Sequence, residues 1–179
     1  SSEETKEQTV DLTLRKVYDF AMDAPLDEIR FILETARLNK AAAESSFDKN
    51  YGHGLGRMLR GTYEHKILGD SVFSHILSYT SGACDARMAG AMIPVMSNSG
   101  SGNQGICATN PVVVYARANE NTEEELIRAL TLSHLTAVYI KQNLGVLSAL
   151  CGCVVASIGS SCGITYLMGG DYTHVCYAV

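Results

Sequence analysis

The chain has 179 residues, of which 46% are hydrophobic and 18% are charged. This composition suits a folded domain with an apolar core, not a disordered chain, so we expect residues 1–179 to form a single helical domain. The net charge of −5 and the absence of lysine or arginine clusters exclude the electrostatic footprint of a protein that binds nucleic acid or an acidic membrane surface.

The N-terminal residues and the cysteines indicate in which cellular compartment the protein is expected. Residues 1–7 carry neither the basic nor the apolar region of a secretion signal, which predicts a cytoplasmic protein. Six cysteines in such a chain are expected to be reduced thiols, metal ligands or core residues, with disulfides less favoured. Two stretches, 88–116 and 142–170, lack Asp, Glu, Lys and Arg, yet polar residues dilute both. We therefore predict burial inside the protein and no membrane span.

The first elements are expected near the N-terminus. Alternating apolar residues at 10–14 predict a short extended segment that runs into a helix near Thr13, a suitable N-cap. A second helix is expected from about Pro25 to Ser46, because proline is tolerated in a first turn and apolar residues then return to one face. A glycine-rich joint at 51–56 precedes another short helical stretch.

The middle of the chain reads mostly as helix. Residues 66–92 show a helical pattern that ends in small residues, which permits tight packing. The apolar run 111–116 fits either a buried strand or the middle of a helix that begins near Gln104, and we favour the helix. Thr122 and Glu125 match a capping box, in which each side chain bonds the backbone N–H of the other residue, so a helix is expected to start there.

The last region, 144–168, contains several glycines and is expected to form packed helices with breaks. A final helix is expected from about Thr173 to the last residue, where no glycine cap, proline or polar run ends it. We therefore expect the chain to be a piece of a longer protein. The predicted fold class is mainly α, a compact bundle of packed helices with glycine-rich breaks and room for one short strand near the N-terminus.

The run 97–105 joins two apolar segments and is rich in hydroxyls, amides and glycines. Where such a turn leads into a helix, its backbone N–H groups and the helix dipole favour an anion such as a carboxylate or phosphate. The run lacks the ending of a nucleotide P-loop and the glycine spacing of a dinucleotide fingerprint. A flexible surface loop is the alternative interpretation. The predicted substrate-binding residues are Ser97, Asn98, Ser99, Gly100, Ser101, Gly102, Asn103 and Gln104.

Two cations stand at the edges of the charge-free stretches, Arg87 and Lys141, and both are added to the predicted substrate-binding residues. Arg87 can hold a carboxylate with two hydrogen bonds, although pairing with Asp85 or another acid is the commoner use of such an arginine. The five histidines are scattered without a metal-binding pair, so we expect them to be structural or exposed to solvent.

The cysteines allow two interpretations. Cys151 and Cys153, with Cys162 and Cys176 further along, can contribute to a metal or iron–sulfur site, because thiolates are the usual protein ligands of such sites. Their spacing matches neither a zinc ribbon nor a ferredoxin, and buried thiols often act as small hydrophobic residues. The residues alone leave both interpretations open.

Four segments together resemble one protein family. They are 81–88 (SGACDARM), 93–106 (IPVMSNSGSGNQGI), 151–156 (CGCVVA) and 162–170 (CGITYLMGG). These segments resemble the bacterial and archaeal cysteine desulfidase family, which is related to the alpha portion of iron–sulfur L-serine dehydratases. The resemblance covers most of the chain, and its most specific part is the asparagine-glutamine-glycine loop.

This resemblance implies a cytoplasmic lyase that performs α,β-elimination on L-cysteine and releases pyruvate, ammonia and sulfide. L-serine dehydration is the alternative activity, and a non-catalytic amino-acid-binding module or a structural subunit is the alternative without catalysis. Family members hold a 4Fe–4S cluster through three cysteines and leave one iron to act on the departing group while a base takes the α-proton. Residues 97–105 are then implied to hold the substrate carboxylate.

Carried over to this sequence, the first cluster ligand falls at Cys151, with Cys153 as its rival, and these two are the predicted metal ligands. The other two ligands and the catalytic base are implied to lie beyond the ends of this chain, so the chain alone is expected to be inactive and without a complete cluster. A homodimer is the expected assembly. The thiols left as core residues are Cys84, Cys107, Cys162 and Cys176.

Overall fold

The computed structural model describes residues 10–144 and 150–179. Its helices are α1 (Leu14–Asp23), α2 (Leu26–Ile29), the 3-10 helix η1 (Arg30–Ile32), α3 (Leu33–Asp48), α4 (Leu55–Met58), α5 (Thr62–Leu68), α6 (Val72–Met88), α7 (Gly102–Ala118), α8 (Glu123–Leu144), α9 (Gly152–Leu167) and α10 (Tyr172–Ala178). These two ranges contain no strand, only helices, turns and an isolated bridge between Asn98 and Ser101. The predicted mainly α fold class is confirmed.

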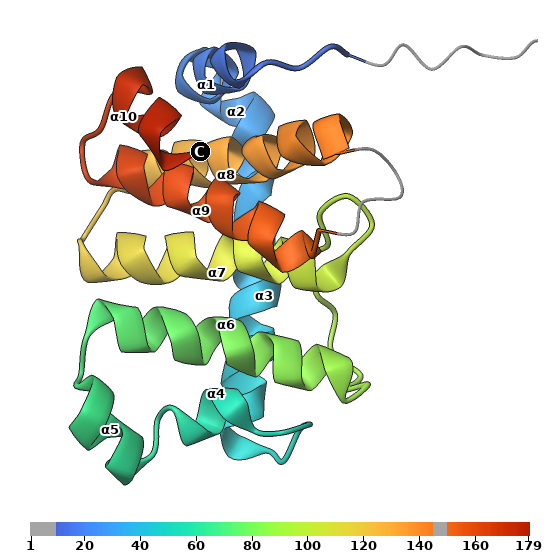
Figure 1. Cartoon of the computed structure of the whole chain (residues 1–179), viewed down its shortest axis with the longest axis vertical. Coiled ribbons are helices and arrows are strands. Elements are labelled where there is room, and N and C mark those ends of the chain that lie inside the picture. The colour runs from blue at the N-terminus through green and yellow to red at the C-terminus, as the bar shows by residue number, and fades with distance from the viewer. Residues whose placement is uncertain (1–9, 145–149) are drawn as a thin grey trace, which may run out of the picture.

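The long helices stack in layers, as Figure 1 shows. Helices α6, α7 and α9 follow one another from bottom to top, and α8 packs against both α7 and α9. Helix α3 crosses behind this stack and contacts α6 and α7. Helices α1 and α10 lie at one end of the molecule, and α4 and α5 lie at the other. The stack therefore holds α7 between neighbours on several sides.

The start of the chain is capped as predicted, but the short strand is wrong. The backbone N–H of Lys16 donates to Thr13 Oγ1 over 3.2 Å, and α1 begins at the next residue after this cap. Residues 10–13 form no strand. A strand needs a neighbour for its backbone groups, and here the carbonyl of Asp11 instead accepts from the side-chain ammonium of Lys16 over 2.8 Å.

The helix predicted from Pro25 to Ser46 is present as α2, η1 and α3 in succession and ends at Asp48. The prediction of one helical pattern over 66–92 is wrong in two places. Gly69 has a φ of +68°, a left-handed conformation that ends α5, and Gly90, with a φ of +72°, follows the end of α6. Glycine adopts these angles without the steric cost that other residues meet.

Three later predictions have clear outcomes. The run 111–116 lies inside α7, so the helix is confirmed over the buried strand. The capping box is confirmed, since Thr122 N–H donates to Glu125 Oε2 over 2.7 Å and Glu125 N–H donates to Thr122 Oγ1 over 3.2 Å. The final predicted helix is α10, which begins at Tyr172.

The predicted breaks after residue 151 are wrong, because α9 passes through Gly159 and Gly163 without interruption. A Cβ atom on Gly159 would lie 2.3 Å from the carbonyl oxygen of Ser133, and one on Gly163 would lie 2.8 Å from that of Ala129. Both oxygens belong to α8. These glycines therefore allow α9 to pack closely on α8. They do not end or bend the helix.

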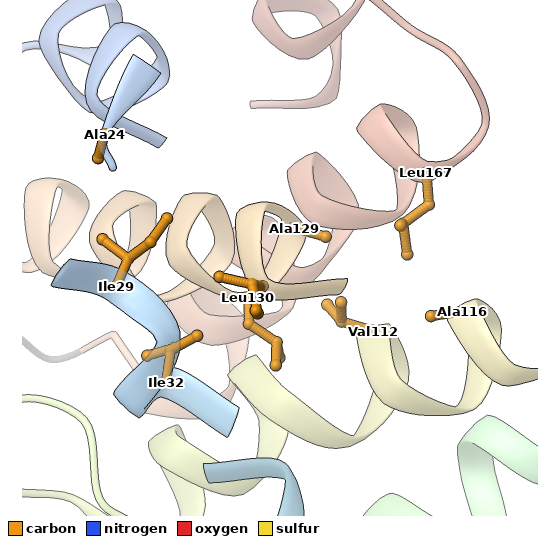
Figure 2. Packing of buried hydrophobic residues seen from close by; sticks show 9 residues of the cluster. Ala24, Ile29, Ile32, Val112, Ala116, Ala129, Leu130 and Leu167 are labelled. Carbon is orange, nitrogen blue, oxygen red and sulfur yellow. The ribbon is translucent and has the colours of Figure 1, made fainter. Parts of the chain in front are cut away.

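The largest buried apolar cluster joins α2, η1, α7, α8 and α9. Figure 2 shows Ile29 and Ile32 on one side of Leu130, and Val112 on the other. Full burial of one such side chain stabilises the fold by about 1.5–3 kcal/mol, so this cluster fixes α7 and α8 against the N-terminal helices. Within the described ranges, no helix is both long enough and apolar enough to cross a membrane.

Candidate functional site

Residues 97–105 form a tight turn followed by the first turn of α7. Asn98 and Ser101 exchange two backbone hydrogen bonds, each of 3.0 Å. The two residues between them, Ser99 and Gly100, have φ angles of +48° and +79°. Positive φ at both central positions is typical of a type I′ turn. Ser101 then caps α7, since its Oγ accepts from the backbone N–H of Gln104 over 3.3 Å.

The side chain of Asn98 fastens this turn to α8. Its Nδ2 donates to the carbonyl oxygen of His134 over 3.0 Å and to His134 Nδ1 over 3.1 Å. Its Oδ1 accepts from Gln104 Nε2 over 2.7 Å and from Ser99 Oγ over 3.0 Å. Asn98 is only 6% exposed, so all of its hydrogen-bonding capacity is used inside the protein. A flexible surface loop does not have this construction.

His134 is buried and neutral, because burial lowers its pKa to about 4. Since Asn98 Nδ2 donates to Nδ1, the ring proton is assigned to Nε2, which then donates to Thr109 Oγ1 over 2.9 Å. Thr109 also accepts from Asn39 Nδ2 over 3.3 Å. The oxygen of that Asn39 amide accepts from the backbone N–H of Met96 over 2.7 Å. Side chains from α3, α7 and α8 thus hold both ends of the turn.

Arg87 lies across the start of α7. A Cβ atom on Gly102 would lie 2.2 Å from Arg87 Nε, and Arg87 Nη1 donates to Asn103 Oδ1 over 3.1 Å. Asp85 is engaged elsewhere, since its Oδ2 accepts from the backbone N–H of Gly56 over 2.9 Å. A cation beside a helix N-terminus opposes the helix dipole. A bound carboxylate would satisfy both the guanidinium and the helix N–H groups.

The start of α9 touches this turn. A Cβ atom on Gly152 would lie 2.8 Å from Gln104 Oε1, so the segment with Cys151 and Cys153 packs directly on the turn. Cys151 is exposed and is the N-cap residue of α9. The backbone N–H of Cys153 lowers the pKa of the Cys151 thiol. A helix N-terminus favours the thiolate, which is the form that binds metals.

Four of the cysteines form a row from α6 across α7 to α9. The thiol of Cys107 interacts with those of Cys84 and Cys153, and Cys153 interacts in turn with Cys151. Hydrogen bonding to Cys84 and burial raise the pKa of Cys107, and burial raises that of Cys153. The cysteine spacing gave no sign of this row, because its members come from different helices. Cys151 is therefore the exposed end of the row, and its thiol has a lowered pKa.

A complete metal site is not formed by the residues that the structure describes. In residues 10–144 and 150–179, no group of three or more His, Cys, Asp or Glu side chains is placed to hold a metal ion. The exposure and lowered pKa of Cys151 suit one ligand of an iron–sulfur cluster. The described residues do not supply a full set of three cysteine ligands.

A family model described as serine dehydratase alpha chain matches residues 2–179. The chain belongs to the serine dehydratase alpha chain family. The predicted relationship to the alpha portion of serine dehydratases is confirmed.

Several relatives of this chain carry the name UPF0597 protein. The chain is 79% identical to one from Bacteroides fragilis over 179 residues, 76% identical to one from Bacteroides thetaiotaomicron, and 55% identical to one from Porphyromonas gingivalis. In each case it is covered completely, yet it spans only 41–42% of the relative's length. No solved structure matches it significantly.

Lys141 is the predicted binding residue that the structure leaves apart. It lies further along α8 than His134 and is partly exposed. Among the described residues, no hydrogen bond or ion pair joins it to residues 97–104 or to Arg87. The binding role of all these residues stays a prediction.

Sequence reasoning missed the supporting residues of the turn. The structural role expected as one of two possibilities for His134 is confirmed, but its bonds to Asn98 were not foreseen. A signal existed, because His134 follows Leu126 and Leu130 at helical spacing on an otherwise apolar stripe. Asn39 and Thr109 gave no such signal, since their contacts join residues 70 positions apart.

Proposed function

We propose that this chain is the helical part of a lyase that removes the β-substituent of a small amino acid. With L-cysteine, elimination and addition of water give pyruvate, ammonia and hydrogen sulfide. With L-serine they give pyruvate and ammonia. The observation that carries the proposal is the contact between Gln104 and Gly152, which brings the turn and Cys151 together although they are far apart in the sequence.

The turn is suited to the substrate carboxylate. The first N–H groups of α7 have no partner within their own helix, and the Arg87 guanidinium lies beside them, held by Asn103. Together they offer two kinds of donor to one carboxylate. Asn98 cannot be spared for the substrate, because its amide is fully engaged with His134, Gln104 and Ser99. Asn98 therefore positions the turn, and the backbone N–H groups and Arg87 bind the substrate carboxylate.

Cys151 is suited to hold a cluster beside that carboxylate. We propose that it supplies one ligand of a 4Fe–4S cluster whose other ligands lie outside this chain. Such a cluster, when bound, supplies a Lewis-acidic iron for the departing thiol or hydroxyl. The His134 ring is neutral near pH 7, so it holds the turn through Asn98 without adding a positive charge that would compete with Arg87. The six free thiols suit a reducing cytoplasm, the compartment we propose.

The test uses a protein of the relatives' full length that contains this sequence, reconstituted anaerobically with iron and sulfide. We expect pyruvate from both substrates, with sulfide from L-cysteine, and the two kcat/KM values identify the preferred substrate. C151S is expected to lower both kcat/KM values more than about 100-fold. This exceeds the loss expected when a residue that only hydrogen-bonds to a metal ligand is removed. If neither product rises above background, the proposed lyase activity is wrong.

Two matched variants make the ligand assignment specific. C176S makes the same substitution at another exposed cysteine, on α10, and is expected to keep activity and cluster absorbance. C153S tests the alternative ligand, Cys153, and this variant is expected to keep the cluster. Loss of the cluster in C153S but not in C151S would reverse the assignment. Light scattering on the same preparation tests the predicted homodimer.

A further inference from the structure

A hollow lies away from the turn, between α3, α6 and the C-terminal half of α7. Its volume is about 470 Å³, which is within the range of small-molecule sites. Helix α7 reaches it with residues from Asn110 to Ala118. In Figure 1 this is the left-hand end of α7, whereas the turn lies at its right-hand end. Gly102 and Arg117 are separated by about 20 Å along the helix, so the two places are distinct.

Three cations from separate elements line this hollow, which we call the α6–α7 hollow. They are Lys40 from α3, Arg60 from the segment between α4 and α5, and Arg117 from α7. Lys40 also pairs with Glu44 over 2.8 Å, and the Arg60 guanidinium lies 4.3 Å from the centre of the Phe47 ring. Cations contributed by three separate elements favour an anionic ligand, and a ligand with two negative groups can engage more than one of them.

The other charges of the hollow leave this positive character in place. Asp70 lines it too, but its carboxylate is paired with His75 Nε2 over 2.5 Å. Arg117 is exposed, and no ion pair or hydrogen bond engages its guanidinium within the described part of the chain. An unpaired arginine on the wall of a cavity is free to take a carboxylate with two hydrogen bonds.

The hollow also has an unsatisfied acceptor in its wall. Asn110 is 1% exposed, and its Nδ2 donates to the carbonyl oxygens of Asn39 and Tyr79 over 3.2 and 3.1 Å. These bonds fix the orientation of the amide. Its Oδ1 finds no partner among the described residues. A buried acceptor without a donor is unfavourable, but this oxygen is itself closed off from solvent, so Asn110 shapes the wall and does not face a ligand in the hollow.

We propose that the α6–α7 hollow binds a small dicarboxylate. One carboxylate meets Arg117, and the other meets Lys40 and Arg60. This site is independent of the proposed elimination reaction. It gives the protein a second small-molecule site at the opposite end of α7 from the turn.

The test is calorimetric titration of the protein, at its relatives' full length, with L-malate, succinate and inorganic phosphate. L-malate and succinate both carry two carboxylates, whereas phosphate is a single anionic group. We expect L-malate and succinate to bind, and phosphate to bind at least tenfold more weakly than either, as the loss of one charged hydrogen bond predicts. Saturating L-cysteine or L-serine is expected not to displace L-malate.

Arginine variants assign the site. R117Q is expected to weaken L-malate binding at least tenfold, a loss on the scale of one charged hydrogen bond. R37Q removes the same charge from an exposed arginine that pairs with Glu34 outside the hollow, and it is expected to bind as the parent does. Thermal unfolding of both variants verifies that they fold. No binding of L-malate at millimolar concentration, equal affinity of R117Q and R37Q, or tighter binding of phosphate would each overturn the proposal.

Discussion

The two ends of α7 are built differently. At its N-terminal end the polar side chains of the turn are paired with one another and with α8, and glycines let backbone approach backbone. At its C-terminal end the long side chains of Arg117 and Lys40 border a hollow, and the Asn110 oxygen is unpaired. A substitution at the first end should therefore cost stability, whereas one at the second end should cost ligand binding and leave stability unchanged.

The largest expected effect is that of G105A at the N-terminal end. A Cβ atom there would lie 2.0 Å from the carbonyl oxygen of Met96 and 2.8 Å from the backbone of Ser97. Backbone cannot yield as the end of a side chain does, so we expect a loss of about 3 kcal/mol or more in the free energy of unfolding. Urea denaturation followed by circular dichroism measures it.

G100A is the control for this variant. Gly100 has a φ of +79° but nothing within 4 Å of its added Cβ, so the cost is that of backbone strain alone, about 1 kcal/mol. Equal losses in G105A and G100A would mean that the close approach at Gly105 does not hold the turn. The difference between the two ends of α7 would then be smaller than the contacts indicate.

The next effect concerns pH and the buried His134. Its folded pKa of about 4 lies below the ordinary value of 6.5, so the unfolded chain binds the proton more readily between these values. The free energy of unfolding should therefore fall as the pH drops from about 7 to 4, with His134 responsible for up to about 3 kcal/mol. Denaturation curves at a series of pH values, compared between the parent and H134Q, isolate this contribution.

H53Q supplies the matched substitution for that experiment, because His53 is exposed to solvent. We expect H53Q to keep the pH dependence of the parent and H134Q to flatten it. An unchanged slope in H134Q would show that the ring does not carry the pH dependence, and the turn would then be less dependent on a neutral histidine than its contacts indicate.

The smallest expected effect is at the C-terminal end of α7. Arg117 makes no ion pair within the described residues, so R117Q should change the free energy of unfolding by less than about 0.5 kcal/mol. The same denaturation measurement applies. A loss as large as that of G105A would show that this end also depends on fixed polar contacts, and the contrast along α7 would disappear.

Local signals in the sequence predicted much of the fold. Thr13 and the pair Thr122 and Glu125 fixed helix starts, because capping depends on residues within one turn of each other. Gly159 and Gly163 were misread as breaks, since a glycine gives the same signal whether it ends a helix or lets another helix approach. Only the tertiary arrangement separates these two uses.

The candidate site was predicted in part. Residues 97–105 and Cys151 were singled out by composition and resemblance, and the contact between Gln104 and Gly152 brings them together. Support from Asn39 and the α6–α7 hollow could not be foreseen. Each depends on side chains from helices that are distant in the sequence, such as Lys40 and Arg117.

The contact at Gly152 has a mechanical consequence. Gln104 Oε1 faces Gly152, while Gln104 Nε2 holds Asn98, which in turn holds His134. One side chain therefore connects the first residue of α9 to the turn and to α8. A shift of Cys151 along the axis of α9 would displace this amide and, through it, the turn. A ligand at the turn and a ligand at Cys151 would therefore both act on the position of the Gln104 side chain.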